Sequence, residues 1–201
     1  MSAIIGICST NFCSFISDKR KTTNQNENWV VSNDDTPKIF KIHDKLLFGA
    51  TGLFFANECI DDAIKPLLED QDISLKAAVQ NILNFLEKRK YKMPKMRNYL
   101  LGGKDEDGQY CMYLIHMNFE TYSPEITFFQ PQLPTANYAI ALSLPPETMQ
   151  YQNQYFNSVN HAIQTSKTVE QMLGKTAGII REISKVSSTV SQDTMTLSLL
   201  G

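Results

Sequence analysis

The sequence predicts an α+β protein in which two antiparallel sheets lie face to face between two pairs of helices, a four-layer αββα sandwich. Three observations support this prediction. Segments with strand-like apolar patterns come in two groups, each group is followed by two segments with helical periodicity, and one strand-like segment ends the chain. Segregated blocks of this kind are typical of α+β proteins rather than of alternating α/β proteins. With 201 residues and no internal repeat or linker, residues 1–201 are expected to form one domain.

The first fifty residues are predicted to form about four strands and no helix. AIIGIC (3–8) and SFISD (14–18) are short apolar runs, and KIFKIHDKLLFGAT (38–51) holds two more around a turn at His43–Lys45. The polar segment KTTNQNENW (21–29) is predicted to be an exposed loop.

The pattern then becomes helical over residues 53–68 and 74–91, where Ala78, Ile82, Phe85 and Leu86 share one face. Ser74 is a suitable N-cap for the second helix, and Pro94 helps to end it. The remaining elements are predicted as two strands around an acidic turn within 98–117, strands at 125–131 and 137–144, helices at 146–164 and 168–186, and a closing strand at 194–200.

Composition excludes several classes of function. Hydrophobic residues make up 42% of the chain, charged residues 20%, and the formal net charge is −2, which is ordinary for a globular domain. The basic segment EKRKYKMPKMR (87–97) is interpreted as a solvated helix end and loop, so no nucleic-acid partner is expected. No apolar run reaches the roughly 20 residues of a membrane helix, and no secretory signal begins the chain. We therefore expect a cytoplasmic protein with no membrane partner.

No metal or other cofactor is expected. The four cysteines lie mostly among apolar residues without Cys-x-x-Cys or Cys/His spacing, and the three histidines are far apart. Buried free thiols are the predicted state of these cysteines.

Ser2 is the first candidate for chemistry. Initiator methionine is usually removed before a small residue, which would leave serine at the N-terminus. A serine hydroxyl needs a base to become a good nucleophile, and an N-terminal α-amine with a pKa of about 7.7–8.0 can be that base. One residue then supplies both nucleophile and base.

Three further residues could complete such a site. Lys38 offers a cation that would lower the pKa of the hydroxyl, Asp18 a carboxylate that would position that cation, and Gly52 a backbone N–H for the oxyanion of a tetrahedral intermediate. Each lies at the end of a predicted strand, where a hairpin sheet can bring them together beside Ser2. Taken singly, each is also compatible with an ordinary turn or strand edge.

The segments SAIIGI, ISDKR, PKIFKIHDKLLFGATG and LLGGKDEDGQYCMYLI together resemble the proteasome β-subunit and HslV peptidase family. In that family an aspartate follows the N-terminal nucleophile by sixteen residues, as Asp18 follows Ser2. A lysine opens a K-I/L-x-x-I strand, as Lys38 opens KIFKI, and a glycine follows that lysine by fourteen residues, as Gly52 does. The lack of a helical N-terminal extension favours a β-type subunit. Beyond about residue 135 only the order of elements supports the resemblance.

The resemblance implies the fold of the N-terminal-nucleophile (Ntn) hydrolases and a threonine/serine-type endopeptidase. Ser2 would be the nucleophile, with Asp18, Lys38 and Gly52 in the roles given above and Arg20 supporting the aspartate. Ser188 and Ser191, in SSTVSQD (187–193), fall near the family's late aspartate and serine. The implied assembly is a homo-oligomeric ring that degrades peptides or unfolded proteins, with an ATP-dependent unfoldase as a possible partner.

Two alternatives stay open. The chain could be a catalytically inactive subunit with an assembly or binding role, because ALSLPPE (141–147) and SSTVSQD replace the family's late glycine–serine–glycine and aspartate–serine motifs, and because Met1, if retained, would block the Ser2 amine. It could also be an Ntn hydrolase that acts on small amides.

Overall fold

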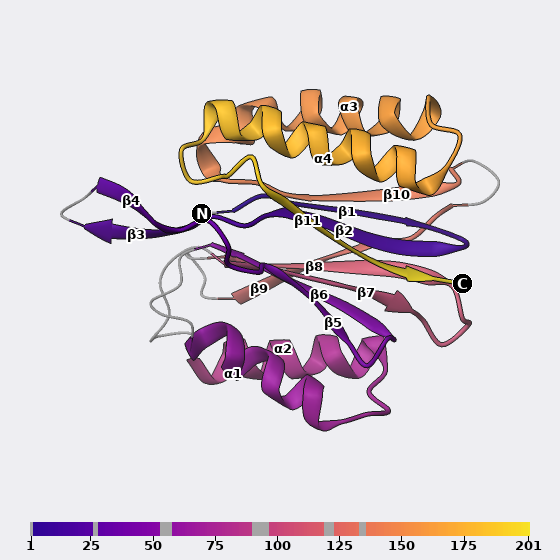
Figure 1. Ribbon diagram of the computed structural model, residues 1–201. Helices are drawn as coiled ribbons and strands as arrows, with labels where there is room; N and C mark the ends of the chain where they lie inside the picture. Colours follow the sequence, from indigo (N-terminus) through magenta and orange to yellow (C-terminus); the bar gives the residue numbers. More distant parts are fainter. Residues whose placement is uncertain (1, 26–27, 53–57, 90–96, 119–122, 133–135) are drawn as a thin grey trace.

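The computed structural model describes residues 2–25, 28–52, 58–89, 97–118, 123–132 and 136–201. In it two antiparallel sheets face one another, and a pair of helices covers the outer face of each sheet (Figure 1). The α+β class with antiparallel sheets is therefore confirmed.

The first sheet contains both ends of the chain. Its strand order is β10-β1-β2-β11, with bounds β10 (Tyr138–Ser143), β1 (Ile4–Ser9), β2 (Phe12–Asp18) and β11 (Thr194–Leu200). Every residue of β1 and β2 is buried, because these inner strands are covered on both faces. The buried position of β1 fixes the residues that precede it, including Ser2.

The second sheet has the strand order β5-β6-β7-β8-β9. Its strands are β5 (Ile39–Ile42), β6 (Leu46–Gly52), β7 (Arg97–Lys104), β8 (Tyr110–Asn118) and β9 (Ser123–Phe129). Side chains alternate between its faces: Phe48 packs toward the helices, whereas Leu47 packs between the two sheets. The sheets approach closely at Gly102, where a Cβ atom would lie 2.6 Å from the Cys13 Sγ.

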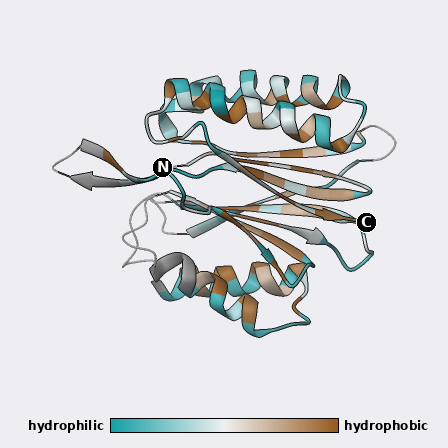
Figure 2. Cartoon of the chain, viewed as in Figure 1, coloured by the Kyte–Doolittle hydropathy of each residue, from teal (hydrophilic) through white to brown (hydrophobic). Residues whose placement is uncertain are grey.

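Helices α1 (Glu58–Glu69) and α2 (Leu75–Arg89) cover the second sheet. The first sheet is covered by α3 (Gln152–Gln164) and α4 (Val169–Val186), preceded by the 3₁₀ helix η1 (Pro146–Tyr151). The predicted N-cap is confirmed, since the Ser74 Oγ accepts the Ala77 N–H at 3.2 Å. Apolar residues gather on the strands and on the inner faces of the helices (Figure 2). None of the described helices is both long and apolar enough to span a membrane.

The loop prediction for residues 21–29 is wrong. Strands β3 (Lys21–Gln25) and β4 (Asn28–Asn33) form a hairpin that projects from the two main sheets (Figure 1). In the described residues these strands pair only with each other, and Val30 and Val31 are exposed. In the part of the chain that the structure describes, the hairpin belongs to neither main sheet, and its sequence lacks the alternation that marks a half-buried strand.

The predicted single helix at 146–164 is also corrected. The backbone at Tyr151 leaves the helical region, with φ −100° and ψ 7°, and separates η1 from α3. Residues 53–57 and 90–94, where the first helix was predicted to start and the second to end, lie outside the described residues.

Three thiols are free and buried, as predicted: Cys8, Cys13 and Cys111. Burial raises the pKa of Cys8 and of Cys111 to about 12, so these thiols are protonated at neutral pH and unreactive. The side chain of Cys59 lies outside the described residues.

Candidate active site

Ser2 lies just before β1 and is 2% exposed. The Lys38 Nζ donates hydrogen bonds both to the Ser2 Oγ and to the Arg20 backbone carbonyl. Lys38 directly precedes β5, and its own carbonyl accepts the Ala50 N–H at 3.0 Å, which ties its backbone to β6. The lysine is thereby held against the serine hydroxyl.

Asp18 ends β2 and is fully buried. The antiparallel register pairs Ile4 with Ser17, which places Asp18 opposite the residue after Ser2. Its Oδ1 accepts the Ala3 N–H at 2.9 Å, and its Oδ2 accepts the Arg20 N–H at 2.9 Å and the Ser191 N–H at 3.5 Å. The carboxylate thus positions the backbone next to Ser2.

Ser2, Asp18 and Lys38 form what we call the charged cluster. Burial lowers the pKa of Lys38, and the negative charge of Asp18 opposes this effect. Burial likewise raises the pKa of Asp18, against the charge of Lys38 and the three backbone N–H donors. Each ion therefore stabilises the charged form of the other in a site that water barely reaches.

Gly52 is the last residue of β6 and has φ +118°, a conformation that side-chain-bearing residues rarely adopt. Gly52 and Ser2 line the same pocket, which has a volume of about 270 Å³. The structure therefore brings the backbone of Gly52 and the hydroxyl of Ser2 to one cavity.

The predicted supporting residues occupy different places. Ser191 is buried against the charged cluster, where its Oγ also accepts the Lys19 N–H at 3.3 Å. The Arg20 guanidinium donates to both carboxylate oxygens of Asp34, at 2.7 and 3.1 Å, and to the Ser188 carbonyl at 3.0 Å. Ser188 is exposed and contributes its backbone to this contact.

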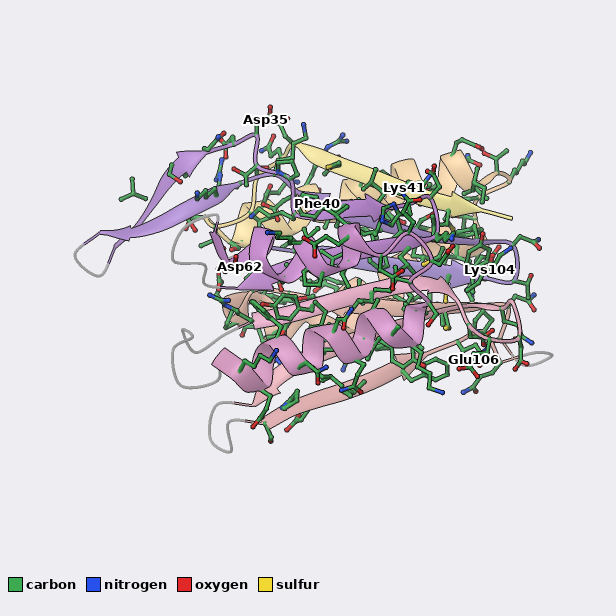
Figure 3. The ribbon with its side chains drawn as sticks, turned by 90° about the horizontal axis from the view of Figure 1, so that it is seen from below. Asp35, Phe40, Lys41, Asp62, Lys104 and Glu106 are labelled. Carbon is green, nitrogen blue, oxygen red and sulfur yellow. The ribbon has the colours of Figure 1, made fainter. Side chains whose placement is uncertain are left out.

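Two acidic residues directly after β4 were missed by the sequence reasoning. Asp34 forms the ion pair with the Arg20 guanidinium described above, and Asp35 accepts a hydrogen bond from the Lys19 Nζ at 2.9 Å. Asp35 lies at the base of the hairpin (Figure 3). The acidic pair DD after β4 and the basic run KRK after β2 were the only sequence signal of this pairing.

Glu147 of η1 was also missed. Its Oε1 accepts hydrogen bonds from the buried hydroxyls of Ser187 and Thr189. These two residues begin the loop that presents the Ser191 N–H to Asp18. Glu147 therefore stabilises the position of this loop. Nothing in the sequence indicated that Glu147 would bind a residue 40 positions away.

A second polar group, which we call the neutral row, lies beside the charged cluster. Thr51, Asn98 and His116 are paired in register across β6, β7 and β8, and Ser143 reaches them from the facing sheet. The Ser143 Oγ lies 2.6 Å from the Thr51 Oγ1 and accepts the Asn98 Nδ2–H at 3.0 Å, while the Asn98 Oδ1 lies 2.5 Å from the His116 Nδ1. Thr51, Asn98 and His116 line the same pocket as Ser2.

The arrangement suits nucleophilic chemistry without a metal ligand set. Among the residues that the structure describes, no group of three or more histidines, cysteines, aspartates or glutamates could hold a metal ion. What the pocket does present is a serine hydroxyl that accepts a hydrogen bond from a buried lysine.

Comparison with known families gives one match. The model of the family described as "Proteasome subunit" matches residues 2–128, a span that includes Ser2, Asp18, Lys38 and Gly52 and ends within β9. No curated protein matches the sequence.

Proposed function

The chain belongs to the proteasome subunit family, and from this membership we propose that it is a peptidase subunit that cleaves peptide bonds through Ser2. The observation that carries the proposal is the hydrogen bond from the Lys38 Nζ to the Ser2 Oγ, made in a buried site where Asp18 holds the adjacent backbone. The chemistry requires a free Ser2 α-amine, so Met1 and anything before it must be removed.

The proposed reaction is acyl transfer in two stages. The Ser2 amine takes the hydroxyl proton, and the Oγ attacks the peptide carbonyl carbon to form a tetrahedral intermediate. Collapse of this intermediate breaks the C–N bond, and the leaving amine takes up the proton that the Ser2 amine had accepted. Water, deprotonated by the same amine, then hydrolyses the ester and regenerates the hydroxyl.

The neighbouring groups would stabilise charge as it develops. The Lys38 ammonium favours negative charge on the Ser2 Oγ, and the Gly52 backbone N–H would donate to the oxyanion. Removing one such oxyanion donor typically slows catalysis by about 10²–10³-fold. Asp18 keeps Lys38 charged and Ala3 in place, while Arg20 and Ser191 hold Asp18.

We extend the proposal to fold and assembly. The facing sheets and their covering helices support the four-layer αββα arrangement of Ntn hydrolases, formed by residues 1–201 as one domain. Proteasome family subunits form oligomeric rings, so we propose a homo-oligomeric ring, of the HslV kind, in the cytoplasm. Its substrates would be peptides or unfolded proteins, delivered where needed by an ATP-dependent unfoldase.

One observation favours a second candidate, an inactive subunit with an assembly role. Ser188 falls near the position where the resemblance implies an aspartate, but it carries no acid and is exposed. In that case Asp18 and Lys38 would serve only to hold the start of β1.

The test combines intact mass with hydrolysis. We expect protein purified from its own cells to begin at Ser2, and the assembled protein to hydrolyse an unfolded substrate such as reduced casein. Ser2→Ala should abolish hydrolysis and leave assembly intact, whereas Ser2→Thr, which keeps the hydroxyl and the amine, should retain activity. A blocked Ser2 amine together with no hydrolysis would refute the peptidase and leave the inactive subunit, whereas full activity in Ser2→Ala would refute Ser2 as the nucleophile.

A further inference from the structure

The pocket beside Ser2 has mainly apolar walls. They are formed by side chains of β8, β10 and the segment that leads into η1: Leu114, Leu142, Leu144, Pro145, Pro146 and Met149. Leu144 and Pro145 are buried, whereas Pro146 and Met149 are exposed and lie at the mouth. A group that enters past Met149 therefore meets aliphatic side chains before it reaches Ser2.

Carboxylate, ammonium and guanidinium side chains are missing from the described lining of this pocket. Among its described lining residues there is no Asp, Glu, Lys or Arg, and the charged cluster contributes only Ser2 to it. A charged ligand group would lose its hydration without gaining an ionic partner among these side chains, which is strongly unfavourable. The side chains of the pocket thus disfavour acidic and basic groups; the free Ser2 α-amine that the proposed function requires is the exception, since its protonated form attracts an acid.

The volume sets an upper bound on the occupant. A cavity of ~150 Å³ lined by aliphatic and aromatic side chains is large enough to bind benzene. The pocket beside Ser2, at about 270 Å³, is larger than this and has room for a phenyl ring or a branched aliphatic group. It is correspondingly too large to be filled by alanine or glycine.

The base of the pocket is already organised. Thr51, Asn98 and His116 hydrogen-bond within the neutral row, directly or through Ser143. Because these polar groups are held by one another, an apolar group can rest against them without stripping them of all their partners. The row therefore gives a fixed floor next to the nucleophile.

We propose that this pocket is a specificity subsite that binds a large apolar side chain of the substrate, phenylalanine or leucine, next to the scissile bond. The proposal rests on the peptidase function proposed above, because it is Ser2 that places the occupant beside a reacting carbonyl. It assigns the substrate class as peptides with an uncharged apolar residue at the cleavage position.

Met149 and Gln150 offer a matched pair of variants. Both are exposed residues of η1, but Met149 lines the pocket and Gln150 does not. Met149→Glu brings a carboxylate to the mouth of the pocket, and Gln150→Glu adds the same charge beside it. Since Met149 is 48% exposed, its replacement should not disturb folding.

Binding is measured without reference to hydrolysis, by ligand-observed NMR with N-acetyl amides of phenylalanine, leucine, lysine and aspartate. We expect the phenylalanine and leucine amides to bind the unmodified protein and the charged amides not to. Met149→Glu should weaken phenylalanine-amide binding about tenfold and improve lysine-amide binding, whereas Gln150→Glu should change neither. Cleavage of a peptide mixture varied on both sides of one bond should follow the same preference.

The outcomes separate the two proposals. Equal binding of all four amides, or identical behaviour of the two glutamate variants, overturns the subsite even if peptides are cleaved. Selective binding that responds to Met149→Glu in a protein that cleaves nothing supports the apolar site and overturns the peptidase function.

Discussion

The charged cluster and the neutral row lie at the same end of the two sheets and border one pocket, yet different interactions stabilise them. In the charged cluster an ammonium and a carboxylate are buried together, and each depends on the other and on backbone N–H groups. In the neutral row hydroxyl, amide and imidazole groups share hydrogen bonds and carry no fixed charge. Burying an ion costs far more than burying a neutral polar group, so loss of a partner should be felt most in the charged cluster.

The largest effect is expected from Lys38→Met, which removes the cation and leaves the carboxylate of Asp18 buried. We predict a loss of about 3 kcal/mol in the free energy of unfolding, measured by urea denaturation. Adding Asp18→Asn should recover part of this loss, because the buried charge is then gone.

The control for this prediction is Lys41→Met, within β5, the strand that Lys38 directly precedes. Lys41 is partly exposed and pairs with Asp44 at 2.8 Å, at the other end of β5 (Figure 3). Such surface pairs contribute about 0–1 kcal/mol, so Lys41→Met should cost less than about 1 kcal/mol. If the two lysine variants are equally stable, the charged cluster does not depend on its cation.

The next effect concerns catalysis and its pH dependence. The negative charge of Asp18 raises the pKa of Lys38 against the lowering caused by burial. Asp18→Asn removes that charge, so the pKa of Lys38 should fall further and the lysine should lose its proton at a lower pH. We therefore predict that the alkaline limb of the kcat/KM profile moves to lower pH.

The same variant should lower the maximum of the profile by about 10–100-fold, because an amide cannot accept all the N–H donors that Asp18 holds. The measurement is peptide hydrolysis from about pH 6 to about pH 10, an interval that spans the usual pKa of an α-amine. An alkaline limb that stays in place or moves upward would mean that Lys38 does not act through its charge.

The charged cluster could be predicted from the sequence because few residue types are suited to the chemistry proposed for it and their spacing matches that of the family it resembles. Ser2, Asp18, Lys38 and Gly52 end or precede strands that are close in the sequence, so short hairpins bring them together. The pairing of β1 with β10 and of β2 with β11, in contrast, depends on contacts across most of the chain.

The neutral row was not predicted, for a physical reason. Thr51 and Ser143 are 92 residues apart and belong to facing sheets, so their contact depends on the register of both sheets and on how the sheets stack. Neutral side chains of these types are also common in turns and at strand ends, so none of them stands out. The contact of Glu147 with Ser187 and Thr189 was missed because it also joins segments far apart in the sequence, 40 and 42 residues respectively.

The smallest effect is expected from Ser143→Ala in the neutral row. The variant removes one hydrogen-bond partner from each of Thr51 and Asn98 without burying a charge. We predict a loss of about 1 kcal/mol in the free energy of unfolding, measured by urea denaturation. Ser158→Ala, at a partly exposed position of α3 where the serine hydroxyl donates to the Gln154 carbonyl of its own helix, should change stability by less than about 0.5 kcal/mol.

The rate of peptide hydrolysis by Ser143→Ala tests whether the charged cluster and the neutral row have separate roles. If the neutral row only shapes the floor of the pocket, kcat should stay within about threefold of the unmodified protein, because the hydrogen bond from Lys38 to the Ser2 Oγ is retained. A loss of kcat as large as that of Asp18→Asn, at unchanged KM, would mean that the row acts on the reacting atoms. The charged cluster and the neutral row would then be two parts of one catalytic network, and the distinction between an ionic site and a neutral floor would fail.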